Sequence, residues 1–154
     1  MGAQMPAETD REKTSGEPAA YRVDQQIGFL LRQANQRHVA IFNARMGDRL
    51  TTTQWSALTK LQDIQPTSQN HLGRETAMDA ATIKGVIDRL VARGYVETSP
   101  DPEDGRRLIL SLTEEGDAVI ARNLDAARAV SEETLAALDP GERRLLLDLI
   151  RRLS

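Results

Sequence analysis

The sequence predicts a mainly α-helical chain with one small antiparallel β-hairpin, that is, an α+β fold. Three observations lead to this prediction. Apolar residues recur at helical spacing through most of residues 23–154. Capping residues, prolines and glycines divide that pattern into segments of helical length. Residues 95–113 depart from it, because two short strand-like runs flank the turn sequence "PDPEDG".

The 154 residues, 40% of them hydrophobic, suffice for one domain with a core. Residues 1–20 differ from the rest, because their only apolar side chains larger than alanine are two methionines. We expect them to form a disordered tail. The tail lacks the apolar core of a signal peptide, and no run in the sequence approaches the roughly 20 apolar residues that cross a bilayer. A soluble, cytoplasmic protein is therefore expected.

Residues 23–46 are expected to form the first helix, with Gly47 as its C-cap. The apolar stripe of this helix consists of Ile27, Leu30, Leu31, Ala34, Ile41 and Phe42. A second helix follows, in which Thr51 and Gln54 have the spacing of a capping box. Pro66 is expected to end it.

Residues 68–94 contain two helices in very few residues. Ser68 is placed to cap the first and Asp79 the second, which Gly94 closes. The second helix is expected to bury Ile83, Val86, Ile87, Leu90 and Val91. Its other face carries Ala81, Thr82, Lys84, Gly85, Asp88 and Arg89. Two helices of this length joined by a short turn match the helix-turn-helix plan.

The segments "YVETS" and "RLILSLT" are expected to pair as strands against these helices. The turn between them would protrude and carry Arg106 and Arg107. A helix-turn-helix followed directly by such a hairpin is a winged helix. Beyond it, Thr113 starts a long helix, and Asp139, Pro140 and Glu142 start the last one. The last helix is too apolar on too many sides to lie alone on a monomer surface.

Three segments together resemble the MarR (multiple antibiotic resistance regulator) family of bacterial transcription factors: "LTTTQWSALTKL", "ATIKGVIDRLVARGYVE" and "DPEDGRRLILSLTEEG". The resemblance implies a homodimer in which residues 21–48 and 115–154 form dimerisation helices. Residues 49–114 would form the winged helix-turn-helix domain, and two such domains would bind a palindromic operator in double-stranded DNA. The sequence departs from many members at Lys84-Gly85, where they carry a small polar residue followed by arginine.

In this architecture the second helix of the motif enters the major groove. Thr82 and Lys84 would reach base edges, Lys84 favouring the acceptors of guanine, and Gly85 would let the backbone approach DNA closely. Arg89 lies on the same face. Thr53, Ser68 and Gln69 lie at helix N-termini that favour phosphate, although ordinary capping also explains them.

The wing supplies the remaining predicted contacts. Arg106 is predicted to enter the minor groove and Arg107 to meet the flanking phosphate, the alternative for both being a solvated turn. Asp104 is predicted to accept hydrogen bonds inside the turn and to brace an arginine.

Most members of the family are released from DNA by a small molecule, often an aromatic or phenolic acid or its CoA thioester. His38 falls on the apolar stripe of the first helix and Arg45 extends it, so each needs a partner or a ligand. Trp55 is placed to line the same cleft. The alternatives are a hydrogen-bonded interface histidine and a core tryptophan.

The sequence contains no cysteine and only two histidines, which excludes thiol oxidation and makes a metal site unexpected. No cofactor is indicated. We find no nucleophile–base pair and no glycine-rich phosphate loop, so an enzyme is not expected. The remaining alternative is a winged helix that binds a protein instead of DNA, which the formal net charge of −3 favours slightly.

Overall fold

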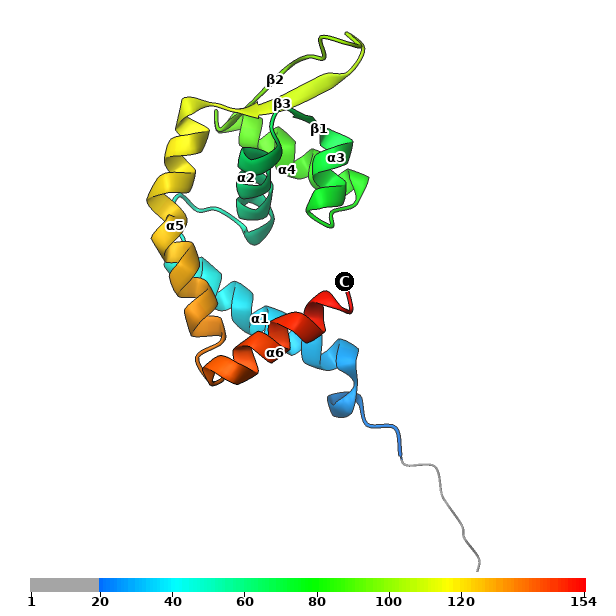
Figure 1. The fold of residues 1–154 in the computed structure, drawn as a ribbon, viewed down its shortest axis with the longest axis vertical. Coiled ribbons are helices and arrows are strands. Elements are labelled where there is room, and N and C mark those ends of the chain that lie inside the picture. Colours follow the sequence, from blue (N-terminus) through cyan, green and yellow to red (C-terminus); the bar gives the residue numbers. More distant parts are fainter. Residues whose placement is uncertain (1–19) are drawn as a thin grey trace, which may run out of the picture.

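A computed structural model describes residues 20–154, and Figure 1 shows the arrangement of their elements. A short 3₁₀ turn, Val23–Gln25, precedes six α-helices and three strands in the described part. In chain order these are α1 (Ile27–Arg45), α2 (Thr52–Ile64), β1 (Thr67–Ser68), α3 (Gln69–Glu75), α4 (Ala80–Ala92), β2 (Val96–Pro100), β3 (Leu108–Leu112), α5 (Glu114–Thr134) and α6 (Pro140–Arg151). The predicted fold class is confirmed. The predicted disordered tail, residue 20 excepted, lies outside the described residues.

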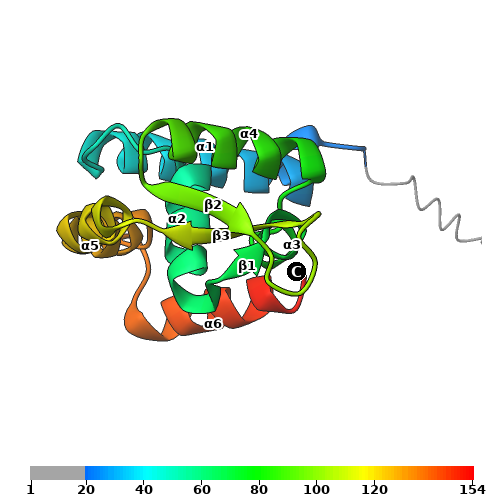
Figure 2. The same cartoon turned by 90° about the horizontal axis from the view of Figure 1, so that it is seen from above.

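Helices α2, α3 and α4 pack with the three strands into one lobe, which we call the winged lobe (residues 49–114). The sheet has the order β1-β3-β2, with both pairs antiparallel. Figure 2 shows α4 beside β2, with the β2–β3 loop extending past the sheet. Strand β1 was not predicted from the sequence, because its two residues, paired with Leu110 and Ile109, carry no periodicity.

Local capping signals place the starts of α2 to α6 as expected, whereas the first helix begins at Ile27 and not at residue 23, because Val23–Gln25 form a separate 3₁₀ turn. Thr51 and Gln54 form a capping box, as do Asp139 and Glu142. Side chains of Ser68, Asp79 and Thr113 accept hydrogen bonds from backbone N–H groups of their own first turns. Each of these contacts satisfies a donor that a helix N-terminus otherwise leaves unpaired.

The core lies between α2, α4, the sheet and the first half of α5. Its fully buried large side chains are Leu58, Leu61, Leu72, Ile83, Leu90 and Val119. The expected burial of Val91 is wrong, since its side chain is 39% exposed. Val91 lies just beyond Leu90 on α4, at the edge of the buried stripe, whereas Ile83, Val86, Ile87 and Leu90 are buried as predicted.

Gly47 is not the C-cap that the sequence predicted. The cap of α1 is Met46, in extended conformation, and the left-handed backbone falls on Asp48 and Arg49, with φ of 53° and 48°. Gly47 instead allows a close approach: its N–H donates to Asn123 Oδ1 at 2.9 Å, and a Cβ there would lie 2.8 Å from that oxygen. Gly94, with φ of 74°, follows the last turn of α4 as predicted.

Helices α1, α5 and α6 lie largely outside the winged lobe. In Figure 1, α5 runs from the lobe toward α1 and α6, at the end of the molecule opposite the hairpin. Helix α6 buries none of its residues. The large apolar side chains that α1 and α6 leave exposed are Ile27, Leu30, Leu31, Leu145, Leu147, Leu149 and Ile150.

Candidate DNA-binding surface and effector cleft

The exposed face of α4 presents the residues that were predicted to meet bases. The first turn is fixed by Asp79, whose Oδ1 accepts a hydrogen bond from the Thr82 N–H at 2.7 Å. Hydrogen bonds from Thr82 also hold the pKa of the Asp79 carboxyl below its ordinary value. The Thr82 side chain is exposed on this face of α4.

Lys84 is engaged rather than free. Its Nζ lies 2.6 Å from Asp88 Oδ2, one helical turn away, and both side chains are exposed. Such a surface pair is weak, about 0.3–0.5 kcal/mol, so another partner of Lys84 can displace Asp88 readily. Arg89 makes no ion pair or side-chain hydrogen bond to any residue in 20–154. A Cβ at Gly85 would meet only Arg89 Nη1, at 3.9 Å, so nothing in the lobe itself requires glycine there.

Between α3 and the wing lies a hollow of about 540 Å³, which we call the α3–wing hollow. It is lined by Ser68, Gln69, Asn70, Arg74, Arg107 and Leu108. The structure thus brings together three of the predicted contacts, Ser68, Gln69 and Arg107. Asn70 and Arg74 were missed from the sequence. They are four residues apart on α3, a spacing that places two polar side chains on one helix face and would have indicated them.

The wing turn is organised by Asp104, as predicted. Its Oδ1 accepts a hydrogen bond from the Arg106 N–H at 3.2 Å, and its Oδ2 lies 3.3 Å from Arg107 Nε. The backbone oxygen of Asp104 also accepts the Arg107 N–H at 2.8 Å. The turn therefore holds Arg107 toward the α3–wing hollow. The Arg106 side chain is exposed and pairs with no side chain of the described residues.

Thr53 lies at the N-terminus of α2, beside the start of α4. A second hollow of about 290 Å³ is lined by Thr53, Asp79 and Thr82, among other residues. Thr53 Oγ1 lies 3.1 Å from Thr51 Oγ1, so its hydroxyl takes part in the capping region as well. The two predicted threonines consequently border one depression on the exposed side of the lobe.

A separate cleft of about 200 Å³ lies between α1, α2 and α5. His38, Phe42, Thr52, Trp55, Ser56, Ala127, Val130 and Ser131 line it. Two of the three predicted ligand residues, His38 and Trp55, therefore share one cleft. Arg45 is not among the lining residues, because its guanidinium pairs with Glu133 on α5. Glu133 is thus the partner that Arg45 was expected to need.

A neighbouring threonine orients the His38 ring. Nδ1 of His38 lies 3.0 Å from Thr134 Oγ1, and that hydroxyl also lies 2.8 Å from the Val130 carbonyl oxygen. Because Nδ1 is occupied by Thr134, Nε2 is the ring nitrogen left for another partner.

Helices in residues 20–154 are all too short or too polar to span a membrane. The same residues contain no cluster of three or more His, Asp or Glu side chains arranged to hold a metal ion.

Comparison with known proteins supports the sequence resemblance. The MarR family model matches residues 50–108, which cover most of the winged lobe. The HTH-type transcriptional repressor NicR of Pseudomonas putida is 45% identical over 134 residues, 86% of this chain and 85% of NicR.

Two solved structures share the fold. A probable transcriptional regulator from Pseudomonas aeruginosa is 52% identical, with a TM-score of 0.85 over 86% of this chain and 100% of that one. BpsR of Bordetella bronchiseptica, whose DNA binding is regulated by 6-hydroxynicotinic acid, is 37% identical, with a TM-score of 0.84 over 87% and 96% of the two chains. This chain therefore belongs to the MarR family of DNA-binding transcriptional regulators.

Proposed function

We propose that this MarR-family repressor binds an inverted-repeat operator as a homodimer and is released from it by a small aromatic acid. The observation that carries the proposal is the grouping of α3, α4 and the wing in one lobe, away from α6 (Figure 1), with the α3–wing hollow within that lobe. The function is binding rather than catalysis, and its proposed place is the cytoplasm, where bacterial operators lie.

The exposed apolar side chains of α1 and α6 support a dimer. Leu145 is 58% exposed and Ile27 62%, and they belong to two helices that bury almost nothing within one subunit. Exposed apolar side chains in this number on two helices favour an interface, because burial against a second copy removes them from water. The dimerisation helices are thus residues 21–48 and 115–154, and the winged lobe is the DNA-binding domain.

On the DNA, Lys84 would exchange Asp88 for a guanine, while Gly85 lets the helix backbone approach the groove. Thr82 and Arg89 complete the face of α4. Ser68, Gln69 and Arg107, together with Thr53, would contact phosphates, and Arg106, on a turn braced by Asp104, would enter the minor groove. In the dimer, two α4 helices would read half-sites about one DNA turn, roughly 34 Å, apart.

Selection of binders from a random duplex DNA pool at moderate salt tests this proposal. An enriched inverted repeat, bound with steep salt dependence, is the expected result. The Arg106→Glu variant should lose that complex. If folded, dimeric protein enriches no sequence, with or without the acids tested below, the alternative of a winged helix that binds a protein partner is favoured.

The cleft of about 200 Å³ favours a single-ring acid over a CoA thioester as effector, since pockets for drug-sized ligands measure roughly 300–1,000 Å³. Trp55 and Phe42 supply apolar walls for a ring. The Ser56 and Ser131 hydroxyls can donate hydrogen bonds to its carboxylate, and Nε2 of His38 can accept one from a ring hydroxyl. The regulation of the related BpsR by 6-hydroxynicotinic acid makes this compound the first to test.

The measurement is titration of the protein–operator complex with 6-hydroxynicotinic, 4-hydroxybenzoic and benzoic acids. We expect the His38→Ala variant to bind operator as the unchanged protein does but to require about tenfold more acid for release, because it loses one hydrogen bond to the ring hydroxyl of the acid. The matched control is Arg45→Ala, which removes a cation from the same helix but outside the cleft. Equal release of all three proteins would exclude this cleft as the effector site.

A further inference from the structure

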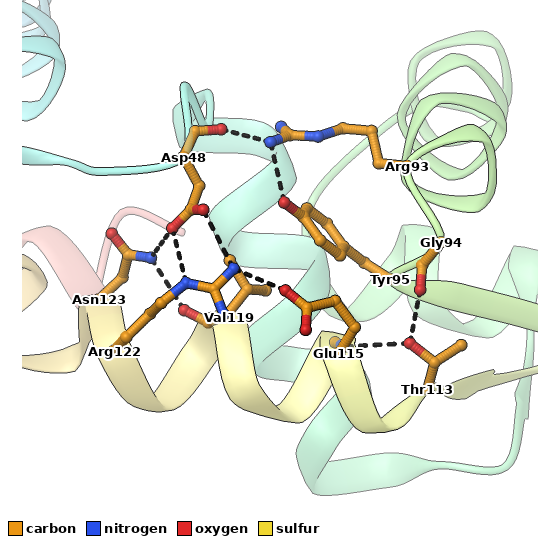
Figure 3. Close-up of polar contacts among 10 residues, drawn as sticks. Asp48, Arg93, Gly94, Tyr95, Thr113, Glu115, Val119, Arg122 and Asn123 are labelled. Carbon is orange, nitrogen blue, oxygen red and sulfur yellow. Dashed lines mark hydrogen bonds and ion pairs between the residues drawn. The ribbon is translucent and has the colours of Figure 1, made fainter.

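The winged lobe is joined to the dimerisation helices at two points of the chain, the α1–α2 connection and the start of α5. One polar cluster links them to the end of α4 (Figure 3). We call it the Asp48 cluster, and it consists of Asp48, Arg93, Tyr95, Glu115, Arg122 and Asn123.

The Asp48 carboxylate attaches the α1–α2 connection to α5. Its Oδ2 accepts hydrogen bonds from Arg122 Nε at 3.1 Å and Asn123 Nδ2 at 2.7 Å, and its Oδ1 accepts from Arg122 Nη2 at 3.1 Å. The arginine contact is therefore bidentate, a geometry that fixes direction as well as distance. Arg122 Nη2 also donates to Glu115 at 2.8 Å, near the start of α5.

The backbone carbonyl of Asp48 holds the C-terminal end of α4. Arg93, the C-cap of α4, donates through Nη2 to the Asp48 carbonyl oxygen and, at 3.0 Å, to the Tyr95 hydroxyl. The Arg93 guanidinium also lies over the Tyr95 ring, 4.7 Å from its centroid. Asp48 thus connects α4, through Arg93, with α5, through Arg122 (Figure 3).

The backbone at this point does not adopt its conformation by intrinsic preference. Asp48 and Arg49 are consecutive non-glycine residues in the left-handed region, at φ of 53° and 48°. Residues in that region persist only where surrounding contacts hold them. Here the contacts are the bidentate pair with Arg122 and the hydrogen bonds of Asn123 to both Gly47 and Asp48.

We propose that Asp48 is a positioning residue, which sets the angle between the winged lobe and α5 and thereby the separation of the two α4 helices in the dimer. The inference rests on the proposed DNA-binding function. It predicts that Asp48 controls which half-site spacing is bound without contacting DNA. A shift of one base pair is about 3.4 Å along the duplex, so a modest change in lobe angle is enough to alter the preference.

The test uses the selected operator and two versions of it, with one base pair added or removed between the half-sites. The variant is Asp48→Asn, because asparagine tolerates left-handed backbone as aspartate does but cannot keep the ion pair. The matched control is Asp125→Asn on α5, which removes the same charge from a pair with Arg128 that stays within one helix. Dimerisation is measured by sedimentation and folding by urea unfolding.

We expect the Asp48→Asn protein to remain dimeric and to keep its half-site sequence, while its preference for the selected spacing falls about fivefold or more, the size seen for residues that couple sites. Asp125→Asn should keep the preference. An unchanged preference in folded Asp48→Asn would overturn the inference, as would an equal loss of affinity on all three spacings. If this variant does not fold, Arg122→Lys, which retains the charge but not the bidentate contact, takes the same test. Failure of the unchanged protein to bind any duplex would instead refute the proposed function.

Discussion

Replacement of Gly85 by alanine separates a role in DNA binding from a role in the fold. A glycine inside a helix costs about 1 kcal/mol relative to alanine. The added Cβ would meet only Arg89 Nη1, at 3.9 Å, which is an ordinary contact. Gly85→Ala should therefore stabilise each subunit by about 1 kcal/mol.

The same variant should bind operator more weakly, because its methyl group occupies the space that the DNA is proposed to take. We expect a loss of about 1–3 kcal/mol, the size of one good base contact, which is about a 5- to 150-fold rise in Kd. Urea unfolding at fixed protein concentration measures the first effect, since the stability of a dimer depends on that concentration. Fluorescence titration of labelled operator measures the second.

Gly116→Ala is the control of opposite sign. A Cβ at Gly116 would lie 2.1 Å from the Tyr95 carbonyl oxygen, which is backbone and cannot move away cheaply. This variant should be destabilised by about 1–3 kcal/mol, as overpacked cores are. If Gly85→Ala binds the operator as tightly as the unchanged protein, the backbone of α4 does not approach DNA at this point. If Gly85→Ala is less stable than the unchanged protein, a side chain at position 85 does not fit its surroundings as inferred here.

Three further predictions follow from particular contacts. Thr113→Ala removes an N-cap and a hydrogen bond to the Gly94 carbonyl, so its free energy of unfolding in urea should fall by about 1 kcal/mol. Thr113→Ser should be close to the unchanged protein. An equal loss of stability in both variants would argue against a role for the hydroxyl. Arg107→Gln should lower the slope of log Kd against log salt by about two per dimer, one for each subunit, while the selected sequence stays the same; an unaltered slope would mean that Arg107 makes no phosphate contact. The hydrogen bonds from Arg122 and Asn123 lower the pKa of Asp48 in the folded protein, so the stability they supply is complete above the ordinary pKa of an aspartate and is lost as the pH falls through the folded pKa. The difference in urea midpoint between Asp48→Asn and the unchanged protein should thus shrink between pH 6 and about pH 3, and a constant difference would show that the ion pair does not contribute.

Features that depend on neighbouring residues could be predicted from the sequence. The capping box of Thr51 and Gln54 involves two residues of one turn, and so does the cap of Asp79 on Thr82. The wing turn, with Asp104 bonded to Arg106 and Arg107, closes within four residues. Caps and turns that close within a few residues cost little chain entropy and require particular residue types at fixed spacing. They can therefore be recognised from the sequence alone.

Features that join distant residues could not be predicted in this way. Strand β1 forms because β3 reaches Thr67 from more than forty positions away. Arg45 was placed in the effector cleft by its position on α1, but Glu133 of α5 takes its guanidinium elsewhere.

The sequence by itself determined the presence of the helices, the N-caps of α2 to α6, the hairpin and the family, because periodicity and capping are properties of contiguous residues. Only the tertiary structure decided that His38 and Trp55 share a cleft, that Arg74 joins Ser68 and Arg107 in one hollow, and that Asp48 connects α4 to α5. Asp48 and Arg122 are 74 positions apart, and their contact exists only because packing of the buried core brings the α1–α2 connection against α5. A hydrogen bond between residues so far apart in the chain leaves no local sequence pattern, because the residues between the two partners do not specify that contact.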